Sequence, residues 1–317
     1  MKAKFLLVLL LAVCTVSLNA QVAQEATDMV PSGKGYGVPA IPGSVPGGSG
    51  FAVTLGNGIN YHGGPIMPGT PHIYFIWYGN WTNGPKPSDS QQTVNLINIL
   101  YAGSGGLGGS PYAKINSTYG DATHQVTGNF SRTRSTTDNY SKGKSVSDAG
   151  IQAIVTRAIS NGSLPKDTNG LYFVLTSSDV SETSGFCTRY CGWHTSAAIL
   201  GADIKYGFVG NSDRCPGACE AQTVSPNGDS GADGMASVMA HETEEAISDP
   251  DLNAWFDSRG QENADKCAWK FGPLHGTLGA GAFNETFGSH NWLIQMNWEN
   301  ARKGGCDQKK GGTFFNF

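Results

Sequence analysis

Six cysteines in the C-terminal half of the chain constrain its fold more than any other feature. They are Cys187, Cys191, Cys215, Cys219, Cys267 and Cys306. In an exported chain an even set of cysteines predicts three disulfides, although spacing alone does not define the pairing. The simplest pairing joins near neighbours, Cys187 with Cys191 and Cys215 with Cys219, and leaves Cys267 with Cys306. The two C-x-x-x-C pairs also allow a structural zinc site, but zinc ligands are usually spaced C-x-x-C, so disulfides are favoured.

The N-terminal segment, residues 1–20, has the pattern of a secretory signal peptide. A basic start at Lys2 and Lys4 precedes an apolar run over 5–13 that is too short to cross a bilayer. A lipid anchor on Cys14 is the weaker alternative. No later segment is apolar for the ~18 residues that a membrane span needs. We therefore predict a secreted, extracellular protein without a membrane span.

The remaining chain is predicted to be a flexible tail followed by one domain. More than half of residues 31–50 are Gly or Pro, so residues 21–59 are assigned to the tail and 60–317 to the domain. Apolar runs predict strands, and apolar residues at helical spacing predict helices. The expected strands are 72–78, 171–176, 206–209 and 292–298, with exposed strands in 124–140; the expected helices are 89–101, 146–160 and 233–248. Since helices and strands do not alternate regularly, we expect an α+β fold with a mixed sheet.

Two of these helices have recognisable ends. Ser147 is placed to cap the helix over 146–160, and Asp233 to cap the helix over 233–248. The sequence Asp-Pro at 249–250 is expected to end the latter. This last helix is predicted to be amphipathic, with a buried apolar stripe, ionisable groups along its border and Glu244 facing solvent.

The border of that helix carries the pattern H-E-x-x-E, from His241 to Glu245. These two side chains lie about 40° apart around a helix, and Glu242 projects beside them. Zinc accepts imidazole nitrogen and carboxylate oxygen, and a nearby glutamate can take the proton of a coordinated water. We therefore predict Zn²⁺ held by His241 and Glu245, with Glu242 as catalytic base. Chance occurrence in a solvated acidic helix is the alternative, but carboxylates half buried beside a histidine favour a cation.

A third protein ligand must come from elsewhere in the chain. The next acidic cluster contains Glu262 and Asp265 and ends just before Cys267, whose disulfide would fix it in place. We expect Glu262 or Asp265 to bind the metal, with both binding, or one orienting His241, as further possibilities. His194 is the other candidate, either as ligand or beside the substrate.

Composition excludes some functions and leaves two open. The chain has 21 Lys and Arg against 25 Asp and Glu, a net charge of −4, so it lacks the basic surplus of a nucleic-acid binder. No G-x-S-x-G elbow is present, which argues against a serine hydrolase. One hypothesis is a secreted zinc-dependent hydrolase, peptidase-like. The other is a non-catalytic module that binds cell-wall or envelope carbohydrate. The partner, whether protein, peptide or polysaccharide, is not specified by the sequence.

Several short motifs, in this order and spacing, resemble the phosphate-induced protein 1 family, also called the Exordium family. They are Tyr61-His-Gly-Gly-Pro-Ile66, Ile76-Trp-Tyr-Gly79, Phe186-Cys187, Cys191-Gly-Trp-His194, Gly210-Asn-Ser212, Cys215-Pro-Gly-Ala-Cys219, Pro226-Asn-Gly-Asp229, Asp233-Gly-Met235, His241-Glu242 with Glu245, Asn253-Ala-Trp255, Glu262-Asn-Ala-Asp265 and Cys267. The resemblance covers roughly 60 to 306. It implies a secreted protein with a zincin-like helix, and it supplies no substrate.

The chain departs from the family pattern at two places. Asn263 stands where members of the family commonly have Ile, and the segment 270–275 replaces part of a Gly-rich stretch after Cys267. The best-known members are plant extracellular proteins linked to growth. The second departure implies that substrate-facing loops differ from those of the plant proteins.

Overall fold

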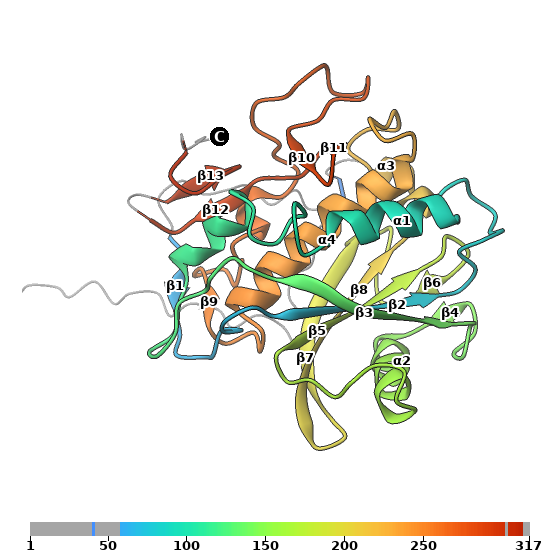
Figure 1. Ribbon diagram of the computed structural model, residues 1–317, viewed down its shortest axis with the longest axis horizontal. Helices are drawn as coiled ribbons and strands as arrows, with labels where there is room; N and C mark the ends of the chain where they lie inside the picture. Colours follow the sequence, from blue (N-terminus) through green and yellow to red (C-terminus); the bar gives the residue numbers. More distant parts are fainter. Residues whose placement is uncertain (1–39, 42–57, 302–303, 313–317) are drawn as a thin grey trace, which may run out of the picture.

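The computed structural model describes residues 40–41, 58–301 and 304–312 (Figure 1). The predicted signal peptide, with Cys14, and nearly all of the predicted tail over 21–59 lie outside the described residues. The following description concerns the described part of the chain.

A five-stranded sheet forms the centre of the fold. Its strand order is β3 (Ser131–Asp138), β2 (His72–Tyr78), β5 (Gly170–Thr176), β8 (Ala202–Gly210) and β7 (Gly192–Ile199). The first four strands are parallel, and β7 pairs antiparallel with β8 at one edge. All of β5 is buried, as expected for a central strand covered on both faces. The edge strand β3 is instead built from Ser, Thr, Arg and Asp, which tolerate solvent.

Helices cover both faces of this sheet. Figure 1 shows α1 (Gln91–Leu100) and α4 (Ser230–Ser248) on one side and α2 (Asp148–Ser160) on the other. The Ser147 side chain accepts a hydrogen bond from the backbone of Gly150, so the predicted cap of α2 is confirmed. The predicted cap of α4 is wrong. That helix begins one turn earlier, where Asp229 accepts from the backbone of Ala232, while Asp233 bonds to neighbouring side chains.

Short elements fill the remainder of the molecule. Four two-stranded sheets pair β1 (Asn60–Tyr61) with β9 (Trp255–Phe256), β4 (Ser145–Val146) with β6 (Ser181–Glu182), β10 (Glu285–Phe287) with β11 (His290–Trp292), and β12 (Asn297–Glu299) with β13 (Gly305–Asp307). The short helices are η1 (Ala113–Thr118), η2 (Ser212–Arg214), α3 (Pro216–Cys219) and η3 (Asp265–Cys267). The continuous strand predicted over 292–298 is wrong, because residues 293–296 form no strand. Both alternating sets of side chains there are buried, so this segment passes through the interior.

The predicted mixture of α and β structure with a mixed sheet is confirmed. Helices and strands do alternate in the first part of the central sheet, although the sequence does not show it. Strand β2 connects through α1 to the parallel strand β3, and β3 connects through α2 to the parallel strand β5. The long stretch over 101–130 between α1 and β3 hides the first of these crossovers in the sequence.

Three disulfides join the cysteines, but only one predicted pair is correct. Cys267 pairs with Cys306, as expected. The local pairs are wrong, because Cys187 pairs with Cys215 and Cys191 with Cys219. One turn of α3 separates Cys215 from Cys219, so both sulfurs face the same segment before β7 and each bonds across to it. The two bonds fasten the start of β7 to the segment that precedes α4.

Candidate metal centre

Helix α4 is buried around its whole circumference. Every residue from Gly231 to Ser248 is buried, including Glu244, so the predicted solvent-facing acid is wrong. Figure 1 shows the cause, since α4 lies between the five-stranded sheet and the C-terminal strands. The helix therefore places three acidic side chains, those of Glu242, Glu244 and Glu245, in the interior of the protein together with His241. Such groups need hydrogen bonds, protons or a cation there.

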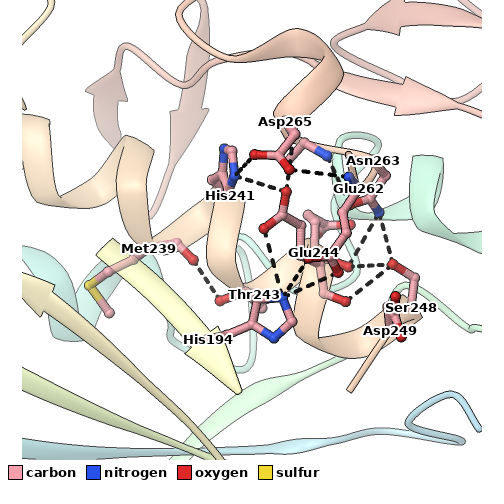
Figure 2. A network of polar contacts seen from close by, with 12 residues as sticks. His194, Met239, His241, Thr243, Glu244, Ser248, Asp249, Glu262, Asn263 and Asp265 are labelled. Atoms are coloured by element: carbon pink, nitrogen blue, oxygen red, sulfur yellow. Dashed lines mark hydrogen bonds and ion pairs between the residues drawn. The ribbon is translucent and has the colours of Figure 1, made fainter. Parts of the chain in front are cut away.

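One group of ligand-type atoms forms around His241. Its Nε2 atom is 2.9 Å from Glu245 Oε1 and 3.5 Å from Asp265 Oδ1. Asp265 begins η3, and its backbone N–H donates to the same Glu245 oxygen at 3.0 Å. These three residues each offer one atom within 4.8 Å of the others. The H-E-x-x-E helix and the acidic segment that follows it are thus brought together (Figure 2).

A second group forms around His194, on β7. Its Nε2 atom is 3.3 Å from both carboxylate oxygens of Glu262 and 3.8 Å from Glu245 Oε2. His194, Glu242 and Glu245 also offer atoms that lie within 4.8 Å of one another. The sequence left Glu262, Asp265 and His194 as alternatives. The structure places Asp265 beside His241 and Glu262 beside His194, while their roles as ligands remain predictions.

Burial dominates the electrostatics of both groups. Burial raises the pKa of Glu262 well above its ordinary value, and the carboxylates of Asp249 and Asp265 raise it further. Burial likewise raises the pKa of Glu245, and Asp265 and Glu262 reinforce the effect. Burial lowers the pKa of His241, but Glu245 and Asp265 outweigh burial and raise that pKa well above its ordinary value. Without a cation, this cluster is therefore stable only if protons are retained on some of its carboxyl groups.

Several polar side chains hold the cluster in place. The Gln295 amide contacts His241 Nδ1, the ring nitrogen opposite the carboxylates. The Asn263 amide donates to Asn116 Oδ1 at 2.8 Å and to Ser248 Oγ at 3.0 Å, which ties the segment of Glu262 and Asp265 to α4 and η1 (Figure 2). Sequence reasoning missed Gln295 because a lone Gln in an apolar run carries no motif. Asn263 was visible only as a departure from the family pattern.

A buried ion pair supports the segment from its other side. Lys266 Nζ lies 3.1 Å from Asp257 Oδ2 and 4.7 Å from the centre of the Trp298 ring. Both charged residues are almost fully buried. The disulfide from Cys267 to Cys306 follows directly. Asp265 is thus held in place from both sides along the chain. Asn263 makes hydrogen bonds before it, and the Lys266 ion pair and the Cys267 disulfide follow it.

Comparison with known proteins places the chain in a family. Residues 59–293 match the phosphate-induced protein 1 conserved region. The chain belongs to the phosphate-induced protein 1 family. This confirms the resemblance given by the motifs, and the matched region contains both histidines and all four carboxylates of the two groups. It ends just before Gln295.

Several plant members of the phosphate-induced protein 1 family resemble this chain along most of its length. Protein EXORDIUM-like 3 of Arabidopsis thaliana is 34% identical over 249 residues, which cover 71% of this chain and 72% of the relative. Protein EXORDIUM-like 5 of the same plant is 31% identical over 284 residues, covering 76% and 75%. Protein PHOSPHATE-INDUCED 1 of Nicotiana tabacum is 27% identical over 221 residues, covering 62% and 67%. No solved structure matches the chain.

None of the helices in the described part of the chain combines the length and the apolar character needed to cross a membrane. The disulfides are consistent with an extracellular protein, because such bonds persist in oxidising compartments.

Proposed function

We propose that this chain is a secreted, zinc-dependent hydrolase of peptidase-like type, with Zn²⁺ held by His241, Glu245 and Asp265. The observation that carries the proposal is the convergence of these three buried side chains from α4 and η3. Ligand atoms at 2.0–2.2 Å from a tetrahedral zinc ion are about 3.3–3.5 Å apart. The separations of 2.9 and 3.5 Å around His241 Nε2 are close to that spacing.

The residues suit hydrolysis as well as binding. Zinc lowers the pKa of a coordinated water to about 7, which supplies a nucleophile near neutral pH. Glu242 follows His241 on α4 and lies with Glu245 in the group around His194, which supports a role for its carboxylate in taking a proton beside the ion. Gln295 lies against Nδ1 of His241, on the side of the ring away from the ion, and with its amide oxygen turned to Nδ1 it would accept the N–H that a zinc-bound histidine carries there. This division between ligands, base and orienting group is the zincin-like feature of the proposal.

A second candidate function follows from the position of the cluster. His241, Glu242, Glu245 and Glu262 are fully buried, whereas a cleft of about 690 Å³ lies elsewhere, between the Gly-rich segment 103–111 and β10. Asn129, Ser131, Glu285 and Thr286 line this cleft with hydrogen-bonding groups. A non-catalytic module would use this cleft for cell-wall or envelope carbohydrate and keep the cluster as a stabilising element.

Metal analysis of the purified mature protein tests the first candidate. We expect zinc to be retained through dialysis and to fall by at least one equivalent per chain in Asp265→Asn. Glu244→Gln is the matched control, because Glu244 is equally buried on α4 but belongs to neither group around the histidines. A folded protein that stays metal-free after zinc is added and the excess removed would reject the proposal.

Glu242→Gln separates the two candidate functions. If the protein is a hydrolase, this variant should lose turnover of a peptide mixture by at least about 100-fold while zinc remains at His241. If the protein is a binding module, neither wild type nor variant should cleave peptides. Both should then bind insoluble polysaccharide to the same extent in a pull-down assay.

A further inference from the structure

We propose that the centre holds two divalent cations rather than one, with Glu245 bridging them. The second ion would lie between His194, Glu242 and Glu245, with Glu262 beside it. This inference rests on the proposed function for the first ion, at His241, Glu245 and Asp265. It assigns His194 and Glu262 to a site of their own, instead of treating them as alternatives to Asp265.

The two oxygens of Glu245 face different histidines. Oε1 is 2.9 Å from His241 Nε2, while Oε2 is 3.8 Å from His194 Nε2. Oε1 also accepts the backbone N–H of Asp265, and Oε2 has no hydrogen-bond partner among the described residues. A carboxylate in this position can give one oxygen to each of two ions. Paired ions in hydrolases lie about 3.5–4 Å apart, a separation that one carboxylate can span.

The ligand set of the second ion is drawn from three separate elements. His194 comes from β7, Glu242 and Glu245 from α4, and Glu262 from the segment before η3. His194 Nε2 is 3.3 Å from both oxygens of Glu262, which is the spacing of two ligands on one ion. Convergence from a strand, a helix and a loop requires the tertiary fold. It differs from a run of acids that happen to be adjacent on one helix.

The charge of the cluster also favours more than one divalent ion. Four buried carboxylates, from Glu242, Glu245, Glu262 and Asp265, surround two imidazoles, which are neutral when they bind metal. Within the described residues, the ion pairs of Glu245, Glu262 and Asp265 are made with His194 and His241, and none involves Lys or Arg. One divalent ion balances two of the four negative charges, and two ions balance all of them.

Two ions would change the role of Glu242. With one ion its carboxylate would act as a base, whereas with two it becomes a ligand of the second ion. Glu242→Gln then lowers the metal content as well as turnover. This variant thus reports on the number of ions independently of any substrate.

The decisive experiment counts the ions in the mature, disulfide-bonded protein after it is stripped with chelator and reloaded with Zn²⁺ or Mn²⁺. We expect two equivalents per chain in wild type and in Glu244→Gln, and one equivalent in His194→Gln, Glu242→Gln and Asp265→Asn. Electron paramagnetic resonance of the Mn²⁺ form should show exchange coupling between the ions in wild type, and uncoupled Mn²⁺ in the three variants. The spectrum of wild type alone shows whether two neighbouring ions are bound, so the test remains valid even if one of the variants misfolds.

The possible results distinguish the two proposals. One equivalent in wild type that is unchanged in His194→Gln and lost in Asp265→Asn would overturn the second site and leave the proposed function intact. No bound metal in folded wild type would reject both. Two uncoupled ions would overturn the bridge by Glu245.

Discussion

The side-chain amide of Gln295 contacts Nδ1 of His241, while Nε2 of the same ring faces the carboxylates of Glu245 and Asp265. A metal-binding histidine usually donates the N–H of its second nitrogen to an acceptor, a role that Gln295 fills when its amide oxygen is turned to Nδ1, and loss of such a partner costs about 10–100-fold in affinity. We therefore predict that Gln295→Leu weakens zinc binding by about 10–100-fold. Competition with a chromophoric chelator measures this change directly.

Gln222→Leu is the control for that prediction. Gln222 is also buried and also makes side-chain hydrogen bonds, but these go to Ala282 and Gly279 rather than to a histidine. This variant should lose stability and keep the zinc affinity of wild type. Equal losses of affinity in the two variants would mean that Gln295 acts only through general packing.

The central sheet could be predicted because its strands are covered on both faces. The runs at 72–78 and 171–176 are continuously apolar or aromatic, and the structure has strands with those bounds to within a residue. The N-terminal cap of α2 could also be predicted from the sequence, since Ser147 accepts a local hydrogen bond from the backbone of Gly150. Features that depend on neighbours in the sequence were therefore recovered.

Features that depend on distant segments were not recovered. Glu244 was placed in solvent because the helix pattern cannot show that the C-terminal strands cover it. The pairs of Cys187 with Cys215 and Cys191 with Cys219 depend on where α3 packs, and sequence spacing favoured the wrong partners. The assignment of Asp265 to His241 likewise needed the path of the chain after α4.

Removal of bound metal should destabilise the fold, because the ligands join α4 to the segment of Asp265. Zinc at 100 times its dissociation constant stabilises a folded protein by about 2.7 kcal/mol. For a domain of this size that corresponds to about 5–10 °C in Tm. We predict that EDTA lowers Tm by this amount in wild type and in Glu244→Gln, and much less in Asp265→Asn, as followed by circular dichroism. A zinc-containing protein whose Tm does not respond to EDTA would contradict this coupling.

The parallel pair of disulfides should stabilise the fold in a non-additive way. Each bond spans 28 residues, but once one has formed, the other closes a ring of only about ten residues. Chain entropy then gives about 2.7 kcal/mol for removal of either bond and about 6.3 kcal/mol for removal of both, so the double loss exceeds the sum of the single losses by about 1 kcal/mol. We predict this pattern for Cys187→Ala with Cys215→Ala, for Cys191→Ala with Cys219→Ala, and for all four substitutions together, measured by urea denaturation.

The third disulfide provides the comparison for that series. Cys267 and Cys306 share no segment with the other cysteines, so substitution of this pair by alanine should add to either of the other pairs without coupling. If the quadruple variant lost less stability than the two double variants together, the shared-loop explanation for the two parallel bonds would be wrong.

Glu220 should make the stability of the protein depend on pH. It directly follows α3 and is only 4% exposed. Burial raises its pKa to about 8, and the neighbouring carboxylate of Asp213 contributes. Because the folded-state pKa lies above that of the unfolded chain, the folded protein binds this proton more tightly. The resulting stability is present at acidic pH and is lost as the pH rises toward and through about 8.

We predict that Glu220→Gln has little effect on stability near pH 4.5 and raises it at pH 9, because the amide is neutral throughout. Each tenfold change in an acid dissociation constant corresponds to about 1.4 kcal/mol. A gain of at least that size, or about 3–5 °C in Tm, is expected at the higher pH. Glu182→Gln is the matched control, because the buried Glu182 carboxylate accepts hydrogen bonds from Tyr190 and Ser184 and should lose stability at both pH values. A gain for Glu220→Gln that is equal at pH 4.5 and pH 9 would show that its carboxyl group does not titrate between them.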